Sequence, residues 1–230
     1  PASGTAGAYQ TGYDVSSYSN VQYHLPADML PFGLGVKFGY VPDMNDTTQL
    51  SAKDDNGATP ASQATGRNLT MLQLTAAPID GLSIGFDIAQ TSNETGVAAS
   101  VEEGMSGNLG AKYTMGPVSV GYTDGRYQPA VASGELTQYE NQFYGIQFDV
   151  NEQLSLSYNV DKSDKITRAK VAVAATAGTK TNLEMEQKTI QAAYTTGGAT
   201  IGIAQAETDN SDYTAGRTEK QTVISLGLSF

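Results

Sequence analysis

Leu82-Ser-Ile-Gly-Phe-Asp-Ile88 places a large apolar residue at every second position and a small or polar residue between each pair. Successive side chains of a strand point to opposite faces, so this spacing predicts a strand with one apolar and one polar face. The same alternation recurs in segments 34–40, 118–122, 144–150, 154–160, 190–194, 199–203 and 224–230. All such runs together predict eleven strands, near 18–25, 33–41, 68–77, 82–91, 107–115, 118–126, 139–150, 154–162, 187–196, 199–206 and 220–230.

The connections between these strands are of two kinds, which alternate along the chain. Short ones are Pro78-Ile-Asp-Gly81, Gly116-Pro117, Asn151-Glu-Gln153 and Gly197-Gly198, with a longer turn at 26–32. Long polar ones cover 42–67, 92–106, 127–138, 163–186 and 207–219. Tight turns at one end and long loops at the other are typical of an up-and-down outer-membrane β-barrel, whereas a soluble Greek-key sandwich has no reason to alternate them.

The distribution of charge along the alternating segments also favours a membrane barrel. Their apolar faces carry no charged residue, and the charges lie on the other face, at Lys37, Asp87, Lys112, Asp149 and Asp161. A lipid-facing Lys or Arg at mid-membrane costs roughly 2–4 kcal/mol, so this separation is expected where one face meets hydrocarbon. Aromatic residues gather toward strand ends, as in interfacial girdles. The alternative is the half-buried sheet of a soluble protein.

Composition excludes several classes of function. The 230 residues contain no cysteine, which removes disulfides and thiol chemistry. The net charge of −11 disfavours nucleic acid as a partner, because a phosphate-binding surface needs a basic patch. The single histidine, His24, has no second histidine with which to build a metal centre or a catalytic dyad, so we expect neither an enzyme nor a resident cofactor.

The C-terminal segment Thr222-Val-Ile-Ser-Leu-Gly-Leu-Ser-Phe230 resembles the terminal strand of bacterial outer-membrane proteins. The order of the segments is similar to that of the Gram-negative general porins, in particular their alphaproteobacterial branch. The matching segments are 18–23, 33–40, 110–122, 144–150 and 190–203. The resemblance implies an outer-membrane channel for small hydrophilic solutes and ions, surrounded by the lipid bilayer and lipopolysaccharide, and associated as a homotrimer.

Two readings of the strand number remain open. Bacterial barrels have an even number of strands, and eleven is odd. In the first reading, residues 18–230 supply the last eleven strands of a sixteen-stranded barrel, and residues 1–17 belong to an external or constriction loop. In the second, segment 7–14 adds a first strand to a twelve-stranded barrel.

In either barrel, selectivity would come from pore width and from charges at the narrowest level. The candidate pore-lining residues are Lys37, Asp87 and Lys112 on the wall, Arg67 and Asp149 nearer the rims, and Asp14 if residues 1–17 fold inward.

A surface adhesin or structural barrel is the alternative function, because the predicted loops are rich in carboxylates. The acidic segments are 43–46, 53–57, Glu102-Glu103 and 208–212. Their oxygen ligands could hold Ca²⁺, although none has the twelve-residue EF-hand spacing.

Overall fold

The computed structural model describes residues 20–25, 29–42, 68–92, 104–128, 135–169 and 180–228. No helix in these ranges is long and apolar enough to cross a membrane. The predicted segment 1–17 lies outside them.

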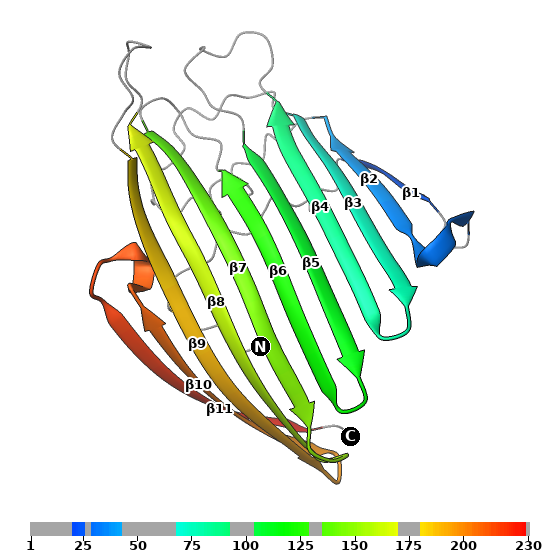
Figure 1. Cartoon of the computed structure of the whole chain (residues 1–230), viewed down its shortest axis with the longest axis vertical. Coiled ribbons are helices and arrows are strands. Elements are labelled where there is room, and N and C mark those ends of the chain that lie inside the picture. The colour runs from blue at the N-terminus through cyan, green and yellow to red at the C-terminus, as the bar shows by residue number, and fades with distance from the viewer. Residues whose placement is uncertain are drawn as a thin grey trace.

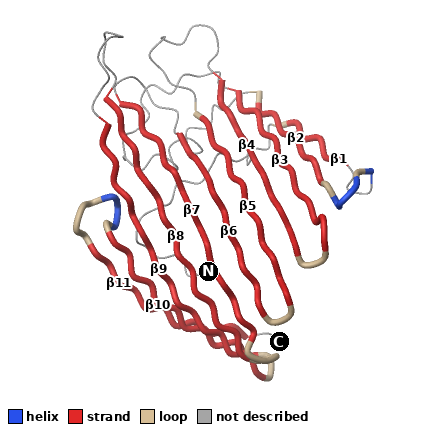
Figure 2. Tube along the Cα trace, in the orientation of Figure 1, coloured by secondary structure: helices blue, strands red, loops and turns tan. Residues whose placement is uncertain are grey.

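Eleven antiparallel strands form one continuous sheet, in which each strand pairs with its neighbours in sequence. The sheet curls along its width (Figure 1), and nearly all of the described chain is strand (Figure 2). The strands are β1 (Val21–Leu25), β2 (Gly35–Val41), β3 (Asn68–Ile79), β4 (Leu82–Ser92), β5 (Met105–Met115), β6 (Val118–Gln128), β7 (Glu135–Asp149), β8 (Leu154–Ala169), β9 (Lys180–Thr196), β10 (Ala199–Asp209) and β11 (Thr218–Leu228). The predicted all-β up-and-down topology is confirmed. The strand number of a closed barrel, sixteen or twelve, stays a prediction.

The strand register separates the side chains into two faces, because directly paired residues of antiparallel strands lie on the same side. Ile146 pairs with Val120 and Tyr158 on the apolar face, and the neighbouring Gln147 pairs with Ser119 and Ser157 on the polar face. Ile146 is 46% exposed and Ile190 is 60% exposed, so the apolar face is not a dry protein core. The fully buried Tyr127 and Tyr139 pair with each other on the polar face.

The short turns take the conformations that their residues favour. Gly197 and Gly198 both have positive φ, at 53° and 83°, which suits a two-residue hairpin between β9 and β10. Asn151 Oδ1 accepts hydrogen bonds from the backbone N–H groups of Gln153 and Leu154, both at 2.9 Å, and so shapes the turn before β8. Pro78 lies within β3 and not in the turn where the sequence placed it. The register shifts between Ala76 and Ile79, and such a bulge tolerates a proline.

At the opposite end the strands are longer than predicted. β8 continues to Ala169 and β9 begins at Lys180, inside the predicted loop 163–186. Charged residues lie on the same side as the apolar face, but outside the alternating segments, whose apolar faces carry none. The charged positions, all next to the boundary with the apolar residues or beyond it, are Asp124, Arg126, Glu140, Lys162, Asp164, Glu184, Glu186, Lys188, Glu207, Asp209 and Lys220.

Many of these charges are paired across or along the strands. Lys162 Nζ lies 2.9 Å from Glu186 Oε2, and Lys188 Nζ lies 2.5 Å from Glu186 Oε1. Lys220 Nζ lies 3.1 Å from Glu207 Oε2. We name all the charged residues of this set, from Asp124 to Lys220, the charged rim. Ion pairs of this kind need water nearby, so the charged rim marks where the apolar face ends.

Candidate functional site

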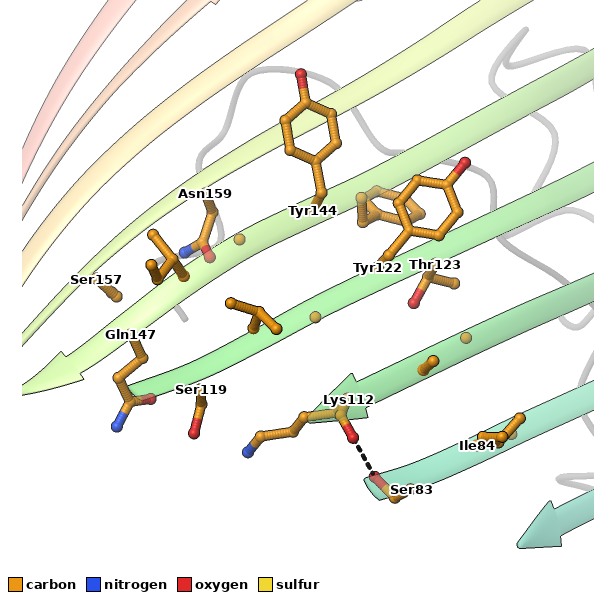
Figure 3. A pocket seen from close by; sticks show the side chains of 18 of the residues that line it. Ser83, Ile84, Lys112, Ser119, Tyr122, Thr123, Tyr144, Gln147, Ser157 and Asn159 are labelled. Atoms are coloured by element: carbon orange, nitrogen blue, oxygen red, sulfur yellow. Dashed lines mark hydrogen bonds between the residues drawn. The ribbon is translucent and has the colours of Figure 1, made fainter. Parts of the chain in front are cut away.

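A hollow of about 810 Å³ lies along the middle of the sheet, and its lining comes mostly from β4 to β8. Lys112, Ser119 and Gln147 project to one side of the strands, and the rings of Tyr122 and Tyr144 project to the other (Figure 3). The polar face supplies the side chains that bound the hollow. The lining also includes residues of the apolar face of the same strands, such as Ile146.

The predicted charged residues lie on this polar face but do not form one cluster. Lys37 pairs with His24 and Gln73, and Asp87 pairs with Gln73 and Asn108. Asp87 Oδ2 accepts a hydrogen bond of 2.8 Å from Asn108 Nδ2. Lys112 borders the hollow, where its carbonyl oxygen accepts a 3.5 Å hydrogen bond from Ser83 Oγ. These side chains come from β2, β4 and β5, so the charges are spread over the wall.

Of the remaining predicted positions, two lie on β7 and β8 and two lie outside the described ranges. Asp149 ends β7, is exposed, and accepts a 2.9 Å hydrogen bond from Gln147 Nε2. Asp161, which the sequence also placed on the polar face, pairs with Phe143 and lines the hollow. Arg67 and Asp14 lie outside the described residues.

Glycines let polar side chains lie flat against the wall of the hollow. A Cβ on Gly110 would approach Thr123 Oγ1 to 2.8 Å, closer than real Cβ contacts allow. A Cβ on Gly145 would likewise collide with Asn159 Oδ1. In contrast, a Cβ on Gly85 would meet nothing within 4 Å. The glycines therefore set back the wall, a role that was not predicted from the sequence.

The turn between β10 and β11 folds onto the polar face, although the sequence predicted only a polar loop there. It contains the short 3-10 helix η3 (Ser211–Tyr213). Tyr213 Oη lies 2.6 Å from the buried Ser163 Oγ, and its ring centroid lies 5.5 Å from that of Tyr139. Lys165 Nζ lies 5.5 Å above the Tyr213 ring and 5.8 Å above the Tyr139 ring, close enough for cation–π attraction. No local sequence pattern marks Tyr213 as an anchor.

Two of the positions considered for catalysis or metal binding lie in the described ranges, namely His24 and the acidic segment 208–212. His24 is exposed on β1, with Nε2 3.1 Å from Gln22 Oε1. In segment 208–212, Asp209 Oδ1 accepts a 3.1 Å hydrogen bond from Thr218 Oγ1, and Asp212 Oδ2 lies 2.6 Å from Arg217 Nη1. Within the part of the chain that the structure describes, no three His, Asp or Glu side chains gather as a metal site requires. The acidic segments 43–46, 53–57 and Glu102-Glu103 lie outside that part, so Ca²⁺ binding there stays a prediction.

No protein-family model matches the sequence, and no curated protein sequence matches it. The solved structures that share its fold include three of OmpT. OmpT, an outer membrane protein of Vibrio cholerae folded in vitro, is 14% identical with a TM-score of 0.54, over 90% of this chain and 60% of OmpT. Its trimer form is 13% identical with a TM-score of 0.53, over 90% and 61%. A mutant of OmpT that lacks loop L8 is 15% identical with a TM-score of 0.55, over 86% and 65%.

This chain thus spans about 60% of the length of the OmpT chain that it matches. The likeness establishes the fold of an outer-membrane β-barrel, and the predicted location in the outer membrane of a Gram-negative bacterium agrees with it.

Proposed function

We propose that this chain forms the wall of a water-filled channel through which small hydrophilic solutes and ions diffuse passively across the outer membrane. The observation that carries the proposal is that the strands have an apolar face and, on the opposite side, a polar face. On β7 the exposed Ile146 and Phe148 face hydrocarbon, and Gln147 between them faces the hollow. A wall that is apolar outside and polar inside is what a water-filled barrel in a membrane requires.

The two ends of the strands suggest the orientation of the channel. In outer-membrane barrels the short turns face the periplasm and the long loops face outward. In that orientation the charged rim lies on the external side, at the level of lipopolysaccharide head groups, and the bilayer covers the apolar face. The outward position of the ion pairs Lys162–Glu186 and Lys220–Glu207 supports this placement.

The charges on the polar face are the proposed determinants of ion selectivity. Lys37, Asp87, Lys112 and Asp149 would line the water path, and we retain Arg67 and Asp14 as proposed rim and loop positions. These charges have both signs and come from different strands. The proposal needs no bound cofactor and no reaction.

We further propose that three copies associate side by side, each with its own channel. The support is the general-porin resemblance of the sequence and the trimer form of OmpT among the matched structures.

Single-channel recording in a planar bilayer tests the channel directly. The folded protein should produce stable, stepwise increases of current, and a heat-unfolded sample should not. A bilayer that stays silent when the inserted protein is folded would contradict the proposal. That result would favour the alternative, an adhesin or structural barrel that acts through its acidic loops.

A further inference from the structure

The hollow on the polar face has the volume of a small-molecule pocket, and glycines form its bottom. Its volume of about 810 Å³ falls within the roughly 300–1,000 Å³ typical of small-molecule pockets. Gly85, Gly110, Gly121 and Gly145 lie along its floor on four consecutive strands. Because these positions lack side chains, the backbone itself forms the bottom of the recess.

The side chains around this floor are mostly uncharged hydrogen-bonding groups. Ser119, Gln147, Ser157, Asn159 and Gln191 line the hollow from the polar face. Each hydroxyl or carboxamide can both donate and accept hydrogen bonds. A ligand that matches them carries many paired donors and acceptors, as hydroxyl groups do.

On the polar face, the lining also contains one aromatic ring and one charge of each sign. Phe143 pairs with Thr123 and Asp161, so its side chain belongs to the polar face, where it lines the hollow. Pockets that hold small molecules commonly combine an apolar surface with a few convergent polar groups. Lys112 and Asp161 have opposite charges, so the lining has no net preference for an anion or a cation.

We propose that this recess is a binding subsite for uncharged polyhydroxylated solutes, of which a neutral oligosaccharide is the chemical type. Sugar hydroxyls would exchange hydrogen bonds with the carboxamides and hydroxyls of the wall, and the C–H face of a sugar ring would pack against Phe143. This inference rests on the proposed channel function and deepens it. The subsite would concentrate neutral sugars within the water path, and its openness keeps the binding weak enough for release.

A tryptophan reporter tests binding without using the conductance. The chain contains no tryptophan, so Phe143→Trp introduces one fluorophore into the recess. Phe148→Trp on the same strand is the matched control, because Phe148 is exposed on the apolar face. Maltotriose should change the emission of the Phe143→Trp protein saturably and leave that of the Phe148→Trp protein unchanged. The trianionic trigalacturonate should bind several-fold more weakly than maltotriose.

Filling the recess provides the second arm of the experiment. A Cβ on Gly121 would lie 3.8 Å from the nearest atom, the Ala111 carbonyl oxygen, so Gly121→Val fits the strand and projects into the hollow. Gly107→Val adds the same group on the apolar side, at 3.4 Å from the Asp87 carbonyl oxygen. In the Phe143→Trp background, Gly121→Val should weaken maltotriose binding by about tenfold or more, and Gly107→Val should not. If Gly121→Val does not fold, Gln147→Ala replaces it, with the same expected direction.

The outcomes separate the two proposals. A channel that conducts, but in which Phe143→Trp does not respond to maltotriose or responds no more than Phe148→Trp, overturns the subsite alone. Equal binding of trigalacturonate and maltotriose, or undiminished binding in the folded recess-filled variant, also overturns it. A silent bilayer with intact saturable binding overturns the channel and keeps the subsite.

Discussion

Tyr213 Oη donates a hydrogen bond of 2.6 Å to Ser163 Oγ, across 50 residues of sequence. The direction follows because the single proton of Ser163 is donated to Asn141 Oδ1, at 2.5 Å. Ser163 and Asn141 are fully buried, so this bond fastens the β10–β11 turn to the interior of the curled sheet.

Tyr213→Ala should release this turn, whereas Tyr213→Phe should loosen it less, because it keeps the ring against Tyr139 and Lys165. We expect Tyr213→Phe to lower the free energy of unfolding by about 1 kcal/mol, the net contribution of one hydrogen bond. Tyr213→Ala should lower it by about 2 kcal/mol, because the aromatic and cation–π contacts are lost as well. Urea unfolding in vesicles measures the stability, and tryptic cleavage after Arg217 measures the exposure of the turn. Equal resistance of Tyr213→Ala and the unchanged protein to trypsin would refute the anchoring role.

Gly110 and Thr123 form a pair that a double-mutant cycle can isolate. Gly110→Ala should destabilise the protein by roughly 1–3 kcal/mol, because the added methyl group is forced against Thr123 Oγ1. Thr123→Ala removes that oxygen and should restore most of the loss in the double variant, since the Thr123 Cβ lies at an ordinary 3.6 Å. Gly85→Ala is the matched control, because its Cβ meets nothing within 4 Å. Additive losses in the cycle would show that Thr123 is not the cause.

The strand ends at the short turns could be predicted from the sequence, because turn residues mark them sharply. β4, β6, β8 and β10 begin at the predicted residues Leu82, Val118, Leu154 and Ala199. Each follows a short turn rich in glycine, proline or asparagine, and apolar alternation starts at once. Pro78 is the exception, because a bulge can accommodate proline within a strand.

The opposite ends could not be predicted from apolar alternation, because the outward residues there are charged. On β8 the outward series runs from Leu156 through Tyr158 and Val160 to Lys162 and Asp164. The backbone ladder continues past Val160, since strand pairing does not depend on the polarity of the side chains. The complementary charges of Lys162 and Glu186 are the sequence signal that could have extended both strands. The position of Tyr213 depends on a contact 50 residues away, which alternation does not encode.

The assignment of hydrocarbon to the apolar face can be tested with two adjacent residues. Leu156 is exposed on the apolar face, where it pairs with Phe148 and Ala192, and Ser157 faces the hollow. Leu156→Lys should reduce the free energy of unfolding in vesicles by roughly 2–4 kcal/mol, the cost of a lysine near the bilayer midplane. Ser157→Lys adds the same charge on the water side and should change the stability by roughly 0–1 kcal/mol. Equal losses for the two variants would contradict the assignment of lipid to the apolar face.

Ion selectivity should depend on which face carries a charge and not on the net charge of the chain. Lys112→Glu and Lys188→Glu make the same change of two charge units, the first beside the hollow and the second on the charged rim outside. At about 0.1 M salt, charges are screened beyond roughly 10 Å, so only a charge close to the water path acts on permeating ions. Lys112→Glu should therefore shift the reversal potential in a salt gradient toward stronger cation preference, and Lys188→Glu should leave it unchanged. The shift should shrink at 1 M salt, where the screening length is about 3 Å. Ions that pass along the polar face come close to Lys112 and not to Lys188. Equal shifts of the reversal potential in both variants would therefore contradict a path along the polar face.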